Sequence, residues 1–375
     1  MRLPRTLSRY MARAVLTYTA LGLLAITTVM VTQNLLRFLD EMISANATGI
    51  DFIAIVGSLC LMLATYTVPI GFLFGILVAF GRLSSDSEIV AMQACGLGLR
   101  SLFSPTLVLG VLMSGLTAYL LFEVEHKAHL ALRQRIKTMA ARGGFIEPGR
   151  FRHLGDRVLF VKSVDPSNRL EGVLISDRSD PQRPLMIFAE SGRLNWNIER
   201  NALEFRLTDG DIHVDARGDV ESLYQRIEFR SFDYHLDAES LFGRSFSTLR
   251  PREMTLSQLR TVVARAEAGE SLQDLRRANP AHYELQIQRR FALPLAPLLF
   301  AFIGSSLGVQ SRRSARSWGV FLCVALVFGY YLILTFGEFL ALRRMLPAEL
   351  ALWLPNLTFA LVSVWLVTRA RRVGI

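Results

Sequence analysis

Six long stretches of the 375-residue sequence contain no Asp, Glu, Lys or Arg, and they constrain the fold more than any other feature. These uncharged windows are residues 14–36, 52–80, 101–122, 291–310, 317–337 and 350–368. Each is close to the ~20 apolar residues that a helix needs to cross the hydrocarbon core of a bilayer. Hydrophobic residues make up 51% of the chain, more than a typical soluble domain contains. The sequence therefore predicts an α-helical membrane protein with six transmembrane helices.

The six windows fall into two groups of three, separated by a long polar segment. We expect residues 1–122 to hold the first three transmembrane helices, residues 123–290 to form an inserted domain, and residues 291–375 to hold the last three. The first window follows several arginines, as in a signal peptide, but it is too long for one and lacks a convincing cleavage site. We therefore expect it to be retained as the first transmembrane helix.

Arginines are distributed unequally between the two sides of the predicted membrane domain. The segments on the side of the two termini carry twelve, namely Arg2, Arg5, Arg9, Arg13, Arg82, Arg100, Arg312, Arg313, Arg316, Arg369, Arg371 and Arg372. The short loops on the other side carry only Arg37, Arg343 and Arg344. Because cytoplasmic loops are enriched in basic residues, we expect both termini in the cytoplasm and the insert on the outer side, which is the periplasm of a Gram-negative cell.

The formal charge of +10 does not indicate a nucleic-acid-binding protein. Residues 123–290 contain 27 Lys and Arg against 25 Asp and Glu, a net of +2, so the other +8 flanks the apolar windows, where membrane orientation explains it. Cys60 and Cys323 lie in windows and Cys95 in a cytoplasmic loop, so the insert has no cysteine from which to form a disulfide.

The insert is predicted to be mostly β. Short runs of strand-forming residues, separated by turn residues such as Asp165-Pro166 and Asp209-Gly210, recur about every ten residues. These runs are residues 157–164, 170–176, 185–189, 193–198, 203–208, 211–215 and 223–232. Seven such strands favour an all-β sandwich or jellyroll domain.

Helical stalks are expected at both ends of this β region. Residues 123–142 are charged and helix-permissive, and Gly143 and Gly144 would end them. A capping box at 255–258 predicts a helix to about residue 268, and a second helix after Pro280 leads into the fourth window. His126 and His129 have a spacing that can bind a metal, but two histidines on an exposed stalk are more often solvated, so we expect no metal site.

Several motifs are absent from the sequence. The lysines Lys127, Lys137 and Lys162 do not follow a glycine-rich phosphate loop, so the chain is not expected to bind or hydrolyse ATP itself. The uncharged windows lack the ionisable residues of an ion-coupled transporter. The insert also lacks a nucleophile signature such as G-x-S-x-G, which argues against an enzyme.

The loop between the second and third windows predicts a short cytoplasmic helix at about residues 85–96. Ser85 or Ser87 can cap it, and Asp86 and Glu88 suit its N-terminus. Ile89 and Met92 then recur on one face, and Gly96 ends the helix. Such an amphipathic helix either docks into a groove on a soluble partner or rests on lipid headgroups.

Two stretches, together with the layout of three helices, a β insert and three helices, resemble the LptF/LptG family of lipopolysaccharide-export permeases. The stretches are LSSDSEIVAMQACGLGL at residues 83–99 and GRFRHLGDRVLFVKSVD at residues 149–165. The Ala94-Cys95-Gly96-Leu97 segment is closer to the LptF branch than to LptG. The resemblance extends over essentially the whole chain.

The resemblance implies a permease of an ABC exporter in the bacterial inner membrane, with an LptG-like second permease and an LptB-like ATPase dimer that uses ATP and magnesium. It implies that residues 86–95 form the coupling helix and that Glu88 engages the ATPase. In the family, basic residues near the outer end of the first span line the lipopolysaccharide cavity. Arg37 matches one of them, with Gln33, Asn34 and Phe38 beside it, whereas Asn34 stands where a second basic residue is expected.

The insert would then pass lipopolysaccharide to LptC-like and LptA-like periplasmic jellyroll proteins, pairing with them through its edge strands. The candidates for an acyl-chain lining are Leu159, Val161, Leu174, Ile187, Leu194, Leu203, Phe205 and Phe229, although strand alternation predicts a packed core equally well. The pairs Gly71/Gly75 and Gly304/Gly308 have the spacing of close helix contacts, which we expect within this chain.

Two other functions fit parts of the sequence. One is a non-transporting ABC membrane subunit that relays ATP hydrolysis mechanically to a periplasmic partner, although such proteins more often have four spans. The other is a membrane-anchored enzyme that modifies lipid, which would need a catalytic constellation and activity without an ATPase.

Overall fold

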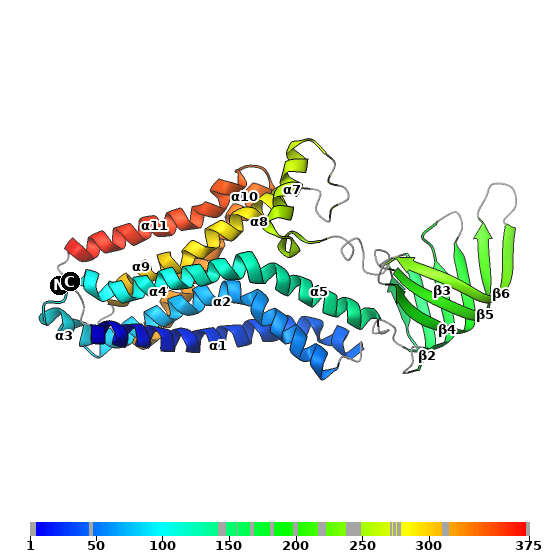
Figure 1. Cartoon of the computed structure of the whole chain (residues 1–375), viewed down its shortest axis with the longest axis horizontal. Coiled ribbons are helices and arrows are strands. Elements are labelled where there is room, and N and C mark those ends of the chain that lie inside the picture. Colours follow the sequence, from blue (N-terminus) through cyan, green and yellow to red (C-terminus); the bar gives the residue numbers. More distant parts are fainter. Residues whose placement is uncertain are drawn as a thin grey trace.

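The structure is a computed structural model of the chain. It describes residues 5–44, 48–141, 148–154, 156–165, 169–180, 184–197, 202–216, 223–237, 249–270, 272, 275, 279–309 and 315–372. The long helices form an elongated bundle, and a β-sheet lies beyond one end of it (Figure 1). Helix α1 begins and helix α11 ends at the opposite end of the bundle (Figure 1).

The helical elements before the sheet are α1 (Arg5–Ser44), α2 (Gly49–Ser85), α3 (Glu88–Ala94), α4 (Leu99–Tyr119), the π-helical turn η1 (Leu120–Val124) and α5 (Glu125–Ala141). Those after it are η2 (Pro251–Glu253), α7 (Leu256–Glu267), α8 (Ala281–Ala292), η3 (Leu293–Leu295), α9 (Ala296–Val309), α10 (Ala315–Leu342) and α11 (Ala348–Arg372).

Six helical segments in the described part of the chain are long and apolar enough to span a membrane. They are Arg5–Leu36, Gly49–Ser85, Ser101–Ile136, Ala281–Gly308, Gly319–Leu342 and Ala348–Leu366. Three precede the sheet and three follow it, which confirms the predicted arrangement.

Helix α2 is the centre of the bundle and contacts α1, α9, α10, α4 and α5. Glycines allow these helices to approach closely, as is common where apolar helices pack in lipid. A Cβ atom at Gly75 would lie 2.6 Å from the backbone nitrogen of Thr19 on α1, and one at Gly308 would lie 2.5 Å from Cβ of Phe80. The predicted close helix contacts are therefore confirmed as contacts within the chain.

The third transmembrane segment continues through η1 into α5, and this stalk is not fully solvated. Glu125 and His126 are buried, and Leu132 packs against Ile55 and Leu59 of α2. The expectation of exposed, solvated histidines was therefore wrong, because His126 is buried and only 14% of the His129 side chain is exposed. The π-helical turn adds a residue to one turn and so shifts the helical phase, which hydropathy does not reveal.

The six strands described by the structure form one antiparallel sheet in the order β1-β2-β3-β4-β5-β6. They are β1 (Phe151–Leu154), β2 (Arg157–Val164), β3 (Arg169–Asp177), β4 (Leu185–Asn197), β5 (Ala202–Ala216) and β6 (Leu223–Asp237). The prediction of an all-β insert is confirmed. Its strands follow each other as a meander, a simpler connection than the Greek keys of a jellyroll.

The predicted turn at Asp209-Gly210 was wrong, because β5 continues through it, as β4 does through residues 190–192. In each of five strands one residue is left out of the pairing, while the register stays the same on both sides. These residues form a crease across the sheet at Lys162, Gly172, Glu190, Asp209 and Arg230. Gly172 and Asp209 have positive φ angles of 60° and 53°, which interrupts the extended conformation.

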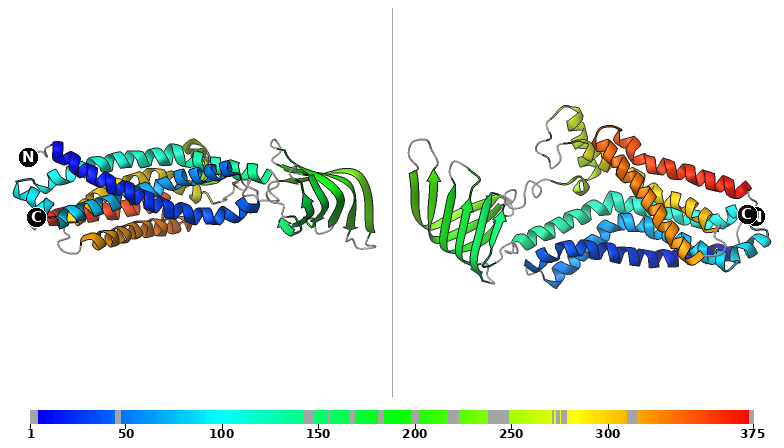
Figure 2. Two further views of the ribbon diagram at one scale, coloured as in Figure 1. Left: turned by 90° about the horizontal axis from the view of Figure 1, so that it is seen from below. Right: turned by 180° about the vertical axis from the view of Figure 1, so that it is seen from behind.

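Side-chain alternation changes phase at this crease. In β4, Ile187 and Ala189 are buried before it and Leu194 after it, so the buried side changes from odd to even residues. Because all five strands shift together, both halves direct apolar residues to the same concave side. Figure 2 shows the strongly curved sheet that results.

The two halves of the sheet face each other across this crease. The hydroxyl of Tyr234 on β6 donates a buried hydrogen bond of 2.6 Å to Asp177 on β3, although β4 and β5 lie between these strands in the sheet. Arg157 donates to the same carboxylate oxygen at 2.8 Å. The insert thus obtains the two layers of a sandwich by folding a single sheet.

The helices after the sheet begin as the sequence predicts. Thr255 caps α7, and its backbone nitrogen donates to Oε1 of Gln258 at 2.9 Å in the expected capping box. The side chain of Asn279 accepts a hydrogen bond from the backbone of Ala281 at the start of α8.

Replacing Asp177 with Asn should weaken the folded sheet. Burial opposes ionisation, but hydrogen bonds from Arg157, Ser179 and Tyr234 outweigh it and lower the pKa of Asp177 to about 2, from 3.8. For Asp177→Asn we expect a loss of about 1.5–3 kcal/mol in the free energy of local unfolding, seen as faster hydrogen exchange in β3 and β6 of the full chain.

Exposed Glu190 on β4 supplies the control, and Glu190→Gln should leave exchange unchanged. Because the folded pKa of Asp177 lies below its ordinary value, the stabilisation is complete above about pH 4 and is lost as the pH falls towards 2. An Asp177→Asn defect as large at pH 2 as at pH 7 would contradict this assignment.

Candidate functional site

The predicted cytoplasmic helix is present as α3, at the end of the bundle opposite the sheet (Figure 1). It is shorter than residues 85–96, because α2 continues to Ser85 and Asp86 forms its C-cap. Ser87 occupies the N-cap position with φ of 60° and makes no capping hydrogen bond through its side chain, contrary to expectation. Glu88 lies in the first turn as predicted, whereas Asp86 instead pairs with Arg82 at 3.5 Å.

Gly96 ends α3 as the sequence predicts, by adopting a left-handed conformation with φ of 84°. Its backbone nitrogen donates to the carbonyl of Gln93 at 2.8 Å, and that of Leu97 donates to the carbonyl of Met92 at 3.2 Å. This pair of bonds is the Schellman arrangement, in which glycine is favoured because it has no Cβ.

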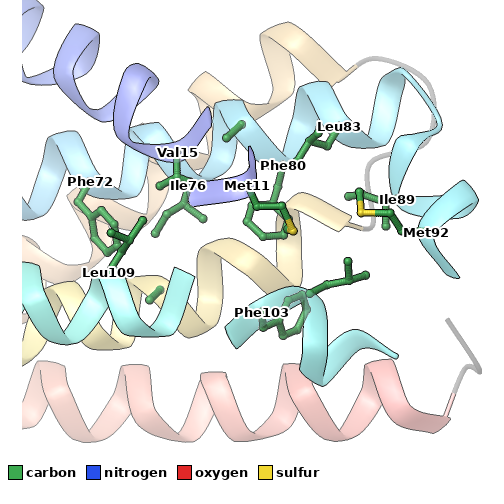
Figure 3. Close-up of a cluster of buried hydrophobic side chains, with 13 residues drawn as sticks. Met11, Val15, Phe72, Ile76, Phe80, Leu83, Ile89, Met92, Phe103 and Leu109 are labelled. Carbon is green, nitrogen blue, oxygen red and sulfur yellow. The ribbon is translucent and has the colours of Figure 1, made fainter. Parts of the chain in front are cut away.

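The apolar face of α3 is buried within this chain. Ile89 and Met92 are 2% and 8% exposed, and they pack into a cluster with Met11 of α1, Leu83 of α2 and Phe103 of α4. Figure 3 shows both side chains directed towards this cluster. They therefore anchor the helix and do not present an apolar surface to a partner. The periodicity of the sequence located this apolar face, but it did not show that other helices of the same chain cover it.

Glu88 is held by a residue distant in sequence. The hydroxyl of Tyr10 on α1 lies 3.1 and 3.0 Å from the two carboxylate oxygens of Glu88, at a solvent-exposed position. Next to it, Val90, Ala91 and Ala94 form the exposed side of α3. The element thus offers an acidic side chain and small apolar side chains on an anchored helix, a surface suited to a protein groove.

The residues predicted near lipid lie towards the end of α1 nearer the sheet. Gln33 is exposed, and Asn34 is partly buried, with its side-chain nitrogen donating to the carbonyl of Met30 at 2.8 Å. The backbone of Arg37 and Phe38 is helical, but their side chains lie outside the described part of the chain, so their predicted lipid contacts stay predictions.

The structure brings most of the predicted insert-lining residues together. Leu159, Val161, Ile187, Leu194 and Phe205 belong to the buried cluster between the two halves of the sheet, and Phe229 packs against it. Leu174 is not in this cluster, although its neighbours Val173 and Ile175 are, so by alternation it points to the opposite face. The side chain of Leu203 lies outside the described residues.

Sequence reasoning missed a group of arginines at the end of the bundle nearer the sheet. Arg250, Arg252 and Arg289 line a cavity there, together with Asn34 and Glu338. Arg250 is the N-cap of η2, Arg252 lies within η2 and Arg289 lies on α8, and no motif joins these segments. Of the three, only Arg289 lies just outside an uncharged window, and this position was the one sequence signal for the group.

Six spans around a β insert, with an anchored helix between the second and third spans, define a multi-pass membrane protein. The family model described as lipopolysaccharide export system permease LptF/LptG matches residues 9–369, and the chain belongs to this family. It is a membrane permease of lipopolysaccharide export, as the sequence resemblance indicated.

The chain is 23% identical over 369 residues to the lipopolysaccharide export system permease protein LptF of Escherichia coli K12, covering 95% of this chain and 93% of that protein. LptF of Shigella flexneri matches to the same extent. An uncharacterized protein of Rickettsia prowazekii, RP871, is 24% identical over 178 residues, covering 46% of this chain and 49% of that protein.

Gly96→Ser should disrupt the end of α3, whereas the same change at Gly98 should not. A Cβ at either position would meet no atom within 4 Å, so the substitutions differ only in backbone conformation. At Gly96 the left-handed conformation costs a residue with a side chain about 1–2 kcal/mol. Gly98 has φ of −77° at the N-cap of α4, where Ser is favoured.

Limited proteolysis of the purified chain between residues 86 and 98 measures this difference. Faster cleavage is expected for Gly96→Ser only. Equal protection of the two variants would show that the left-handed conformation does not hold α3 in place.

Proposed function

We propose that this chain is an LptF-like subunit that extracts lipopolysaccharide from the inner membrane, with an LptG-like second permease and a separate LptB-like ATPase dimer. Both termini and α3 lie in the cytoplasm and the sheet lies in the periplasm. The unequal distribution of arginines supports this orientation.

The observation that carries the proposal is the anchoring of α3 at the arginine-rich end of the bundle. Ile89 and Met92 fasten it to α1, α2 and α4, while Glu88 and the small exposed residues face outward. An ATPase that binds this surface therefore moves three transmembrane helices together when its nucleotide sites close. The Tyr10 contact adds a second connection to α1.

The second permease would cover the spans that this chain buries least. In the first and fifth spans 22% of the apolar window is buried, compared with 61% in the second and 67% in the fourth. Helix α10 in particular has one exposed apolar face, consisting of Phe321, Val324, Phe328, Leu332 and Phe336. These exposed apolar faces of the first and fifth spans favour a lipid cavity that forms between two permeases.

The folded sheet would receive the lipid and pass it on. Its two halves bury an apolar interior, and β1 and β6 are its edge strands. An unpaired strand edge can add a strand from another protein, which supports pairing with LptC-like and LptA-like periplasmic proteins.

Affinity purification in mild detergent tests this assembly, and we expect an ATPase, a second permease and lipopolysaccharide to copurify with the chain. Glu88→Ala should greatly reduce ATPase recovery, because a carboxylate that pairs with a basic residue of the partner is lost. Tyr10→Phe removes the internal hydrogen bond but keeps the carboxylate, so it should retain most of the ATPase.

Equal losses in Glu88→Ala and Tyr10→Phe would show that Glu88 acts only within this chain. Unchanged recovery and export with Glu88→Ala would refute the docking role. Recovery of lipid-modifying activity from the single chain without an ATPase would overturn the proposed function itself.

Arg37→Glu should weaken lipid contact at the outer end of α1, because an arginine there suits bidentate binding of a lipid phosphate. A photocrosslinker at exposed Gln33 reports lipopolysaccharide contact in cells, and we expect its yield to fall severalfold. Arg344→Glu, a charge reversal in another loop on the same side, is the control and should leave the yield unchanged. An unchanged yield with Arg37→Glu would refute the phosphate role.

A further inference from the structure

The fourth span is broken near its middle. Helix α8 ends at Ala292, the 3₁₀ turn η3 follows, and α9 begins at Ala296. Pro294 and Pro297 account for the break, because neither residue has an amide hydrogen to donate within the helix. The backbone nitrogen of Ala296 donates to the carbonyl of Leu293, as in a 3₁₀ helix. The carbonyl of Ala292 therefore lacks the donor that a regular α-helix would give it.

Side chains from two other spans satisfy the carbonyls at this break. Nδ2 of Asn356 on α11 donates to the carbonyl of Ala292 at 2.8 Å, and the hydroxyl of Ser114 on α4 donates to the carbonyl of Pro294. Asn356 is itself buried and accepts a hydrogen bond of 2.9 Å from the hydroxyl of Tyr330 on α10. A backbone carbonyl without a donor is costly in the bilayer, so the Asn356 bond stabilises the break in its present geometry.

Three other spans also have irregular backbone. Helix α2 contains Pro69 and α11 contains Pro355, and each proline removes one hydrogen bond from its helix. The third span contains the π-helical turn η1, in which each backbone bond reaches one residue further than in an α-helix. Sharp kinks in helices occur at prolines and at π-helical turns. Four of the six spans therefore have a position at which the helix can bend.

One buried cluster joins these four irregular segments. It contains Leu121 of η1, Leu293 of η3, and Leu352, which lies three residues before the proline of α11. Tyr66, three residues before the proline of α2, packs against the cluster. The four bends therefore lie at one level of the helical bundle.

On the side of this level nearer the sheet, the helical segments are joined to one another. Arg133 of α5 forms a salt bridge of 2.6 Å with Glu253 of η2, and Arg290 of α8 donates to the carbonyl of Met254 at 2.6 Å. Helix α7 packs against α8 (Figure 1), and α5 packs against the part of α2 that precedes Pro69. We call these segments the outer unit. On the other side of the level, α9 packs against α2 and α4.

We infer that the four bends form a hinge across the membrane domain and that Asn356 is the positioning residue that holds it. The outer unit, from which both connections to the sheet begin, tilts at this level relative to α9. Asn356 holds one tilt, because its bond to Ala292 joins α11 to the broken span. The inference rests on the proposed function only for the process that the hinge serves, the passage of lipopolysaccharide from the spans to the sheet.

Distances between two spin labels in the purified full chain, with its copurifying partners, test the role of Asn356. The labels are attached at Arg260→Cys on α7 and Ser104→Cys on α4, both exposed positions, after the three native cysteines are changed to serine. We expect Asn356→Leu to broaden the distribution of distances, because the carbonyl of Ala292 loses its donor. Tyr330→Phe keeps the bond from Asn356 to Ala292 and should give a distribution close to that of the wild type.

Pro294→Ala tests whether the break itself serves export. Alanine restores an amide hydrogen, so the fourth span should bend less readily and the distribution of distances should narrow. In cells depleted of their own permease, lipopolysaccharide export should fall severalfold although the chain stays folded. Pro105→Ala removes a proline from α4 outside the hinge and should export as the wild type does.

An Asn356→Leu distribution as narrow as that of the wild type would overturn the role of Asn356, and full export by Pro294→Ala would overturn the hinge. Because Pro294→Ala adds a backbone donor, it tests the hinge even where Asn356→Leu fails to fold. A wild-type chain that does not restore export would refute the proposed function, whereas the label distances in the same chain would still test the hinge.

Discussion

The close packing of α2 against α1 and α9 is the contact on which the rest of the membrane domain depends. Lipid offers little hydrophobic drive for helix association, so helices gain most by approaching closely. Gly75 lets the backbones of α1 and α2 meet, and Gly308 admits Phe80 from α2 towards α9. The last three spans are thereby joined to the first three, although the whole β insert separates them in sequence.

Helices α1 and α2 connect the two ends of the helical bundle. At one end α1 and α2 contact α3 through Met11 and Leu83, and at the other they line the cationic cavity through Asn34 and Met62. Each of these two helices is thus continuous from the contact with α3 to the cavity.

The β insert shows how one local irregularity, repeated, produces a domain shape. Each of five strands shifts its side-chain alternation at the crease, and Gly172 and Asp209 do so with left-handed backbone. The shift keeps apolar side chains on the concave side while the sheet folds, and the buried Tyr234–Asp177 hydrogen bond joins the halves. An apolar interior is thus built without a second sheet.

Amino-acid order alone predicted the six spans, the all-β insert and the helix carrying Glu88, because these depend on local properties: charge-free length, residue alternation and capping residues. It divided β4 and β5 wrongly, since a phase shift in alternation resembles a turn until neighbouring strands show the same shift. It also located the apolar face of α3 without showing that Met11 and Phe103 cover it. The Tyr10–Glu88 contact and the arginine cavity depend on segments far apart in the chain, and helix packing alone brings their side chains together.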